Sequence, residues 1–376
     1  MMSHSPGSAP PPAASISVST RYGSELVVAG SSANDTIKIS ESGSTLTIAA
    51  DGQVYTDPAP SAGIFVYTRG GSDSVTIDAS VSARTTVDSI DAGKTIINTA
   101  GTNVSVWMDS TDSETGATTG LHAVASFAGG VSKAVGAALP NPKDAKQTVA
   151  VTNRSLFGTG PVANDVNQGA VGDCWFLAGL ASLAGQKTSL IQESAVDMGD
   201  GTYVVQFERG GTPTYVRVSN QLTKGNFNGF YYASPGANGT IWAMIMEKAL
   251  CFYRSGRNTY NSISGGLGSE TLNDFNISST TILPGSLSES ALYLEISNDL
   301  AGGKPVMFGT PNNPPDLVGD HEYTVISCSI DSAGLTHYVV RNPWGVAGDS
   351  LEDPLGYATI TYAQLVANSD GITQAV

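Results

Sequence analysis

Short runs of β-branched residues recur along the first third of the chain, between Arg21 and Ser110, and Gly, Asp, Asn and Ser fill the gaps. Neighbouring runs are 9 to 11 residues apart. Short strands at so regular a spacing predict a parallel β-solenoid. An antiparallel β-sandwich is the alternative, because strands every ~8–12 residues also fit that fold. The runs are centred near positions 26, 37, 46, 55, 65, 75, 86, 96 and 105.

Two of the gaps carry a glycine–aspartate pattern. Residues 30–37 read Gly-Ser-Ser-Ala-Asn-Asp-Thr-Ile, and residues 70–77 read Gly-Gly-Ser-Asp-Ser-Val-Thr-Ile. Both loosely resemble the nonapeptide repeats of calcium-binding β-rolls, although they lack the second glycine step. A structural or adhesive β module is therefore favoured over a calcium site here.

The flanking segments lack the strand pattern. Residues 1–20 are rich in Ser, Pro and Ala and have no charged stretch followed by an apolar one, which predicts a disordered tail rather than an ordinary secretory signal. Residues 111–150 open polar, turn apolar from Leu121 to Leu139 and close on Pro140-Asn-Pro, which predicts one or two weak helices and then a linker. We thus expect a tail (1–20), a β-repeat domain (21–110), a junction (111–150) that could cover a cleft as a propeptide does, and a second domain (151–376).

A continuous run of apolar and small residues extends from Cys174 to Ala184 without a β-branched residue. Its length predicts a helix buried on all sides. Gly172 or Asp173 can cap its N-terminus, so that Cys174 falls in the first turn. Free backbone N–H groups and the positive end of the helix dipole favour a thiolate there. The alternative for any single cysteine is a buried structural thiol.

Two β-rich runs flank a turn at Asp331-Ser-Ala-Gly and predict a hairpin. A turn centred between Ser332 and Ala333 places Asn342 opposite Tyr323. His321 and Asn342 then become diagonal neighbours on one face, roughly 7–8 Å apart at the backbone. His337 is five residues from Asn342 and points to the opposite face. The geometry thus selects His321 as the histidine that an amide can orient.

Three further features surround these residues. Trp344 follows Asn342 closely and can lie over the His–Asn pair, and Gln168, six residues before Cys174, can supply an oxyanion donor together with the Cys174 N–H. Gly265 and Gly266 give flexible backbone that could line a substrate cleft, with a plain loop as the alternative. A helix around Trp242 to Tyr253 presents one apolar face.

Composition narrows the partners. The 376 residues carry a net charge of −15, which argues against a nucleic acid or an anionic membrane surface. Three cysteines make no disulfide framework, and no apolar run is long enough to predict a spanning helix. We expect a cytoplasmic protein or one exported without a Sec-type signal peptide.

The blocks Gln168-Gly-Ala-Val-Gly-Asp-Cys-Trp-Phe-Leu-Ala, His321-Glu-Tyr-Thr-Val and Arg341-Asn-Pro-Trp-Gly resemble the three catalytic blocks of the calpain cysteine proteases. Cys174 precedes His321 by 147 residues, which agrees with the Cys–His–Asn order and spacing of papain-like enzymes. The resemblance implies an α+β papain-like fold with a helical lobe and a β lobe. It also implies Cys174 as nucleophile, His321 as base, Asn342 as orienting residue and Gln168 as oxyanion donor of a cysteine endopeptidase. The expected partner is then a protein or peptide substrate.

The chain departs from that family at Glu322, where a small residue is more usual, and it shows no EF-hand loop. No cofactor is needed for the thiol chemistry, calcium is left open as an activator, and no metal ligands are assigned. A catalytically silent calpain-like binding module is one alternative function. A cysteine acyltransferase or transglutaminase is the other, although such enzymes usually orient the histidine with Asp.

Overall fold

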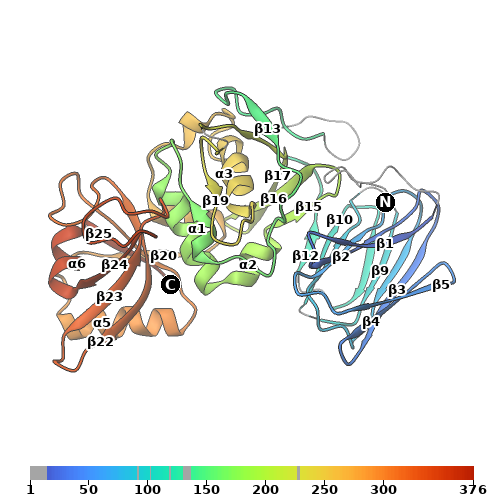
Figure 1. Ribbon diagram of the computed structural model, residues 1–376, viewed down its shortest axis with the longest axis horizontal. Helices are drawn as coiled ribbons and strands as arrows, with labels where there is room; N and C mark the ends of the chain where they lie inside the picture. Colours follow the sequence, from blue (N-terminus) through green and yellow to red (C-terminus); the bar gives the residue numbers. More distant parts are fainter. Residues whose placement is uncertain (1–14, 91–92, 102, 118–119, 130–136, 227–228) are drawn as a thin grey trace.

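The computed structural model describes residues 15–90, 93–101, 103–117, 120–129, 137–226 and 229–376. The N-terminal strands form two six-stranded sheets, and from β6 onward consecutive strands alternate between them (Figure 1). One sheet has the order β1 (Ser17–Arg21), β2 (Glu25–Ala29), β6 (Ile64–Tyr67), β8 (Thr85–Asp88), β10 (Val104–Met108) and β12 (Leu121–Ala123). The other has the order β11 (Ser113–Gly116), β9 (Thr95–Asn98), β7 (Ser74–Ile77), β3 (Thr36–Ser42), β4 (Thr45–Ala50) and β5 (Gln53–Pro58).

Pairing in these sheets is mostly parallel. In the first sheet Ile64 lies opposite Thr85, and Thr85 lies opposite Val104. In the second, Ser74 lies opposite Thr95. Antiparallel pairs occur at the start of the region, where β1 meets β2 and where β3, β4 and β5 form a meander. Alternate apolar residues of both sheets, such as Ile37 and Val87, are fully buried between them.

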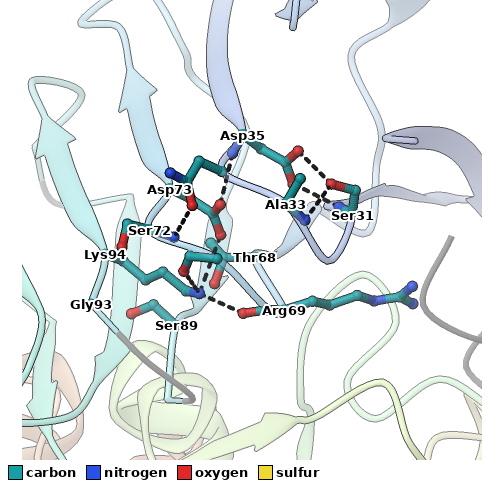
Figure 2. A network of polar contacts seen from close by, with 12 residues as sticks. Ser31, Ala33, Asp35, Thr68, Arg69, Ser72, Asp73, Ser89, Gly93 and Lys94 are labelled. Carbon is teal, nitrogen blue, oxygen red and sulfur yellow. Dashed lines mark hydrogen bonds and ion pairs between the residues drawn. The ribbon is translucent and has the colours of Figure 1, made fainter. Parts of the chain in front are cut away.

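A lysine ammonium group binds the second of the two turns that resemble calcium-binding repeats (Figure 2). Lys94 Nζ donates to the carbonyl oxygens of Arg69 and Gly71 at 2.5 and 2.6 Å, and it lies 3.3 Å from Asp73 Oδ2. The other carboxylate oxygen of Asp73 accepts from the backbone N–H of Asp35 at 2.8 Å. The carbonyl and carboxylate oxygens of the second turn thus face a cation that belongs to the chain itself.

The flanks of the β region differ from expectation. Strand β1 begins at Ser17, inside the predicted tail, of which residues 1–14 lie outside the described residues. The helix predicted from Leu121 is wrong for residues 121–129: Leu121 pairs with Val106 in β12, and Phe127 forms a bridge with Tyr215. Pairing with distant strands supplies the backbone partners that a local helix would have supplied.

The second half of the chain has two hydrophobic cores. The first surrounds helices α1 (Cys174–Gln186) and α3 (Trp242–Tyr253). Helix α3 is buried on all sides from Trp242 to Cys251, rather than on one face as predicted, and Tyr253 is half-buried. The second lies between helices α5 (Glu289–Ala301) and α6 (Tyr362–Asn368) and a six-stranded sheet. That sheet has the order β20 (Ser279–Ile282), β25 (Gly371–Ala375), β21 (Val306–Gly309), β22 (Glu322–Ile330), β23 (Thr336–Arg341) and β24 (Tyr357–Thr361).

Smaller elements complete the first core. They are β13 (Thr148–Ala150) with β18 (Gln221–Thr223), β14 (Val166–Asn167) with β19 (Ser234–Pro235), the sheet of β15 (Ala195–Asp197), β16 (Thr202–Arg209) and β17 (Thr212–Ser219), helices α2 (Thr188–Glu193) and α4 (Gly268–Asp274), and the 3-10 turns Ala163–Asp165 and Tyr260–Ile263.

Helix α1 connects the two cores. The backbone carbonyl of Ala178 accepts from Thr324 Oγ1 of β22 at 2.7 Å. Ser182 Oγ accepts from the Val306 N–H of β21 at 3.0 Å. These bonds fix the middle of α1 against the sheet that carries both strands of the hairpin.

An apolar contact joins the N-terminal sheets to the second half. Ile90, Trp107 and Val124 pack in one cluster with Val196, Val204 and Tyr215 of β15, β16 and β17. The Trp107 ring stacks on His122, whose Nδ1 lies 2.5 Å from Gln206 Oε1. The two halves therefore share a buried interface rather than meeting only at a linker.

Candidate active site

Cys174 is the first residue of α1, as the apolar run predicts. The helix is buried from Trp175 to Ala184, and the Cys174 side chain itself is half-buried at the edge of a cleft. Burial raises the pKa of the Cys174 thiol to about 11, which the nearby charges of Glu322 and Asp173 reinforce and a hydrogen bond from the Glu322 backbone opposes. Desolvation thus outweighs the lowering expected at a helix N-terminus.

His321 and Asn342 lie in hydrogen-bond contact. His321 directly precedes β22 and Asn342 directly follows β23, and Nε2 of the histidine is 2.8 Å from Oδ1 of the asparagine. Thr324 lies opposite Arg341. This pair belongs to the predicted register, in which Tyr323 faces Asn342. A bulge between Val325 and Ser327 shifts the pairing by one residue toward the turn, where Ile330 lies opposite Thr336. The turn is therefore centred on Ala333, and the predicted centre between Ser332 and Ala333 is wrong.

The Asn342 amide is oriented by three further bonds. Its Oδ1 also accepts from the Trp344 N–H at 2.9 Å, while its Nδ2 donates to Glu352 Oε2 and Oε1 at 3.0 and 3.2 Å. Because Oδ1 is the acceptor, His321 Nε2 carries the hydrogen and Nδ1 is left as the basic nitrogen. Burial lowers the pKa of His321 to about 4, against a raising effect of the bond to Asn342.

Glu352 is a residue that the sequence reasoning missed. Besides Asn342, its carboxylate accepts from Tyr323 Oη at 2.6 Å and from the Gly348 N–H at 2.8 Å. It lies in an irregular segment between β23 and β24, where no periodicity marks it. The one expectation that points to such a residue is that a buried Asn342 amide needs a hydrogen-bond acceptor for its Nδ2 group.

The second strand histidine lies elsewhere. His337 pairs with Ser329 near the turn, and its Nε2 is 3.0 Å from Asp331 Oδ2. His337 therefore lies away from the His321–Asn342 pair, as the prediction of opposite faces requires.

The other predicted residues line one cleft of about 820 Å³. The side of the cleft next to the first core is lined by Gln168, Cys174, Gly265 and Gly266. Trp344 lines the side next to the six-stranded sheet, and its ring centroid is 5.0 Å from that of His321. A Cβ on Gly266 would meet the Trp175 ring at 2.6 Å, so this position requires glycine. The lining residues include none from the described part of the junction, 111–150.

Gln168 is tied to its own loop. Its Nε2 donates to the Val171 carbonyl at 2.8 Å, and its backbone N–H donates to the Pro343 carbonyl at 2.8 Å. A primary amide has a second N–H hydrogen that this bond does not use.

Neither a metal cluster nor a membrane span is found within the described ranges. These residues contain no group of three or more His, Cys, Asp and Glu side chains that could hold a metal ion. None of the helices described is both long and apolar enough to cross a membrane.

Sequence comparison gives the family. A family model described as calpain family cysteine protease matches residues 141–349, more than half of the chain. The fold and the Cys–His–Asn arrangement thus occur in a chain that belongs to the calpain family of cysteine proteases.

Individual relatives agree. Calpain clp-4 of Caenorhabditis elegans is 30% identical over 215 residues, which is 52% of this chain and 29% of the relative. The calpain-1 catalytic subunit of Mus musculus is 28% identical over 220 residues, 53% of this chain and 30% of the relative. The calpain-type cysteine protease ADL1 of Oryza sativa subsp. japonica is 25% identical over 221 residues, 54% of this chain and 10% of the relative. The match thus spans less than a third of the length of each of these relatives.

Proposed function

We propose that this protein is a cysteine endopeptidase in which Cys174 is the nucleophile, His321 the base and Asn342 the orienting residue. The observation that carries the proposal is the 2.8 Å contact of His321 Nε2 with Asn342 Oδ1, in the cleft that Cys174 also lines. The contact leaves Nδ1 of His321 as the nitrogen that can take the thiol proton.

The reaction then follows from the named groups. His321 Nδ1 removes the Cys174 proton, and the sulfur attacks the peptide carbonyl carbon. The Cys174 N–H and the second hydrogen of Gln168 Nε2 donate to the developing oxyanion. The protonated His321 gives its proton to the leaving amine, and water activated by the neutral His321 hydrolyses the thioester.

The two groups of the proposed catalytic pair, the Cys174 thiol and the His321 ring, are not hydrogen-bonded to each other among the described residues. A thiol with a pKa near 11 and an imidazole with a pKa near 4 are both neutral around pH 7. We therefore propose that activation brings the two groups together, and we retain calcium as the proposed activator.

Two architectural inferences accompany this function. The parallel pairing of alternating strands supports a β-solenoid for the N-terminal region rather than a sandwich. The two cores on either side of the cleft support a papain-like arrangement of a helical and a β lobe. The predicted domain limits and the role of the β region as a structural or adhesive module remain proposals.

The test is hydrolysis of casein and of fluorogenic peptides by the full chain, with calcium and with a chelator, in the presence of a primary amine. New peptide N-termini support an endopeptidase. Amine-linked products instead indicate acyl transfer, and peptide binding without any product indicates a silent binding module.

A further inference from the structure

A buried carboxyl group lies in the cleft beside the proposed catalytic residues. Glu322 directly follows His321 and lines the cleft, yet only 7% of the residue is exposed. Its Oε1 is buried and has no hydrogen-bond partner among the described residues. Burial, together with the charge of Asp370, raises the pKa of Glu322 to about 8. An unpaired carboxylate in such a place is costly, so it favours a ligand that supplies positive charge.

A second carboxyl group converges on the same space. Asp370 precedes β25, is exposed and also lines the cleft. A Cβ on Gly309 would lie 2.7 Å from Asp370 Oδ1 and 3.4 Å from Glu322 Oε2, and a Cβ on Gly268 would lie 2.5 Å from Glu322 Oε1. Gly309 has an ordinary strand conformation, so what glycine provides here is room between the two carboxyl groups.

Among the described residues, the cleft lining offers the carboxyl groups of Glu322 and Asp370 no lysine or arginine side chain as a partner. The two carboxyl groups also fall short of a calcium site, which takes about six to eight oxygen ligands, and no group of three acidic or metal-ligating side chains occurs among the described residues. The charge, the open space and the unpaired Oε1 instead match an organic cation.

We propose that Glu322 and Asp370 form a subsite for a cationic side chain of the substrate, arginine above lysine, at one position close to the scissile bond. This inference rests on the proposed peptidase function. A guanidinium is planar and has five N–H donors, so it can donate to both carboxyl groups at once, whereas an ammonium is a point charge. Its entry gives Glu322 Oε1 a donor and leaves both carboxylates ionised and paired.

The test uses capped peptides that differ only in carrying Arg, Lys, Leu or Glu at each position flanking the scissile bond. At one position the full chain should cleave the Arg peptide with kcat/KM about tenfold or more above the Leu peptide, which corresponds to about 1.4 kcal/mol. Glu322→Gln and Asp370→Asn should each reduce that ratio toward one. Because both peptides meet the same Cys174 thiol in each variant, any change in the pKa of that thiol cancels in the ratio. Glu295→Gln, which removes an exposed charge on α5, is the matched control and should leave the ratio unchanged.

Binding distinguishes failure of the subsite from failure of the peptidase proposal. Fluorescein-labelled forms of the same peptides are titrated onto full-length Cys174→Ala, which needs no turnover. Tighter binding of the Arg peptide that is lost with Glu322→Gln supports the subsite even if no peptide is cleaved. If Glu322→Gln does not fold, Gly309→Ala fills the same space and should remove the preference. Equal or better cleavage and binding of Leu peptides at every position overturns the proposal.

Discussion

The amide nitrogen of Asn342 lies 3.0 Å from Oε2 and 3.2 Å from Oε1 of Glu352, which fixes the opposite edge of the amide toward His321. Glu352 is thus a positioning residue that acts on the proposed base through Asn342. It is not among the residues that line the cleft, and of its bonds to Asn342, Tyr323 and Gly348 the bonds to Asn342 lead to the proposed base.

Glu352→Ala should lower kcat about 10- to 100-fold, since a hydrogen bond to a charged group contributes about 1.5–3 kcal/mol. KM should change little, because the cleft lining is intact. Glu352→Gln keeps an acceptor for Asn342 Nδ2 and should recover much of the loss. Peptide hydrolysis across pH provides the check: equal loss in the Ala and Gln variants, with an unshifted pH profile, would indicate a purely structural role.

The two strand histidines should behave differently. His321→Ala removes the base and should reduce activity by about a hundredfold or more. His337 contacts Asp331 far along the hairpin, so His337→Ala should leave activity per folded molecule unchanged. Hydrolysis is compared at equal folded concentration. An inactive His337→Ala beside an active His321→Ala would contradict the site.

Glu322 should make stability depend on pH. Its pKa is raised from 4.5 in the unfolded chain to about 8 in the folded one, so the folded state binds more protons between these values. Wild-type stability should therefore fall, through this group, as pH rises from about 4.5 to about 8, and Glu322→Gln should gain relative to wild type over that window. Urea unfolding at several pH values measures the difference in free energy of unfolding between Glu322→Gln and wild type. Glu295→Gln, at an exposed position, is the control. A difference that does not change with pH would refute the effect.

Lys94 should stabilise the N-terminal sheets. Lys94→Met leaves the buried Asp73 carboxylate uncompensated and should cost about 3–5 kcal/mol, the range for breaking a buried ion pair. Adding Asp73→Asn to that variant should restore part of the loss. Lys38→Met, at an exposed position of β3, is the matched control. Thermal unfolding measures the melting temperature of each variant. Equal melting temperatures of Lys94→Met and Lys38→Met would show that the Lys94 ammonium group is dispensable.

Features that depend on neighbouring residues in the chain could be predicted from the sequence. The buried α1 follows from an apolar run without β-branched residues. The hairpin also follows from its pattern, but the predicted pairing holds near His321 and Asn342 only because a bulge offsets a turn that lies elsewhere than predicted. Strand spacing located the β region but could not choose between parallel and antiparallel pairing, because both fit the same steps.

What the sequence did not reveal depends on distant contacts. β12 is a strand because Leu121 lies opposite Val106, and Glu352 matters because the fold carries it to Asn342. The sequence also predicts that residues 151–376 fold alone, yet Val204 and Tyr215 are buried against Trp107 and its neighbours. The fragment would expose that apolar surface, which argues for a shared interface.

The central claim is tested most directly by the turnover of Cys174→Ser on casein, measured beside wild type under the same activating conditions. An alcohol is a far weaker nucleophile than a thiol that His321 can deprotonate. The account predicts loss of nearly all hydrolysis, with folding unchanged and Cys251 and Cys328 still present. Wild-type hydrolysis by Cys174→Ser would contradict it.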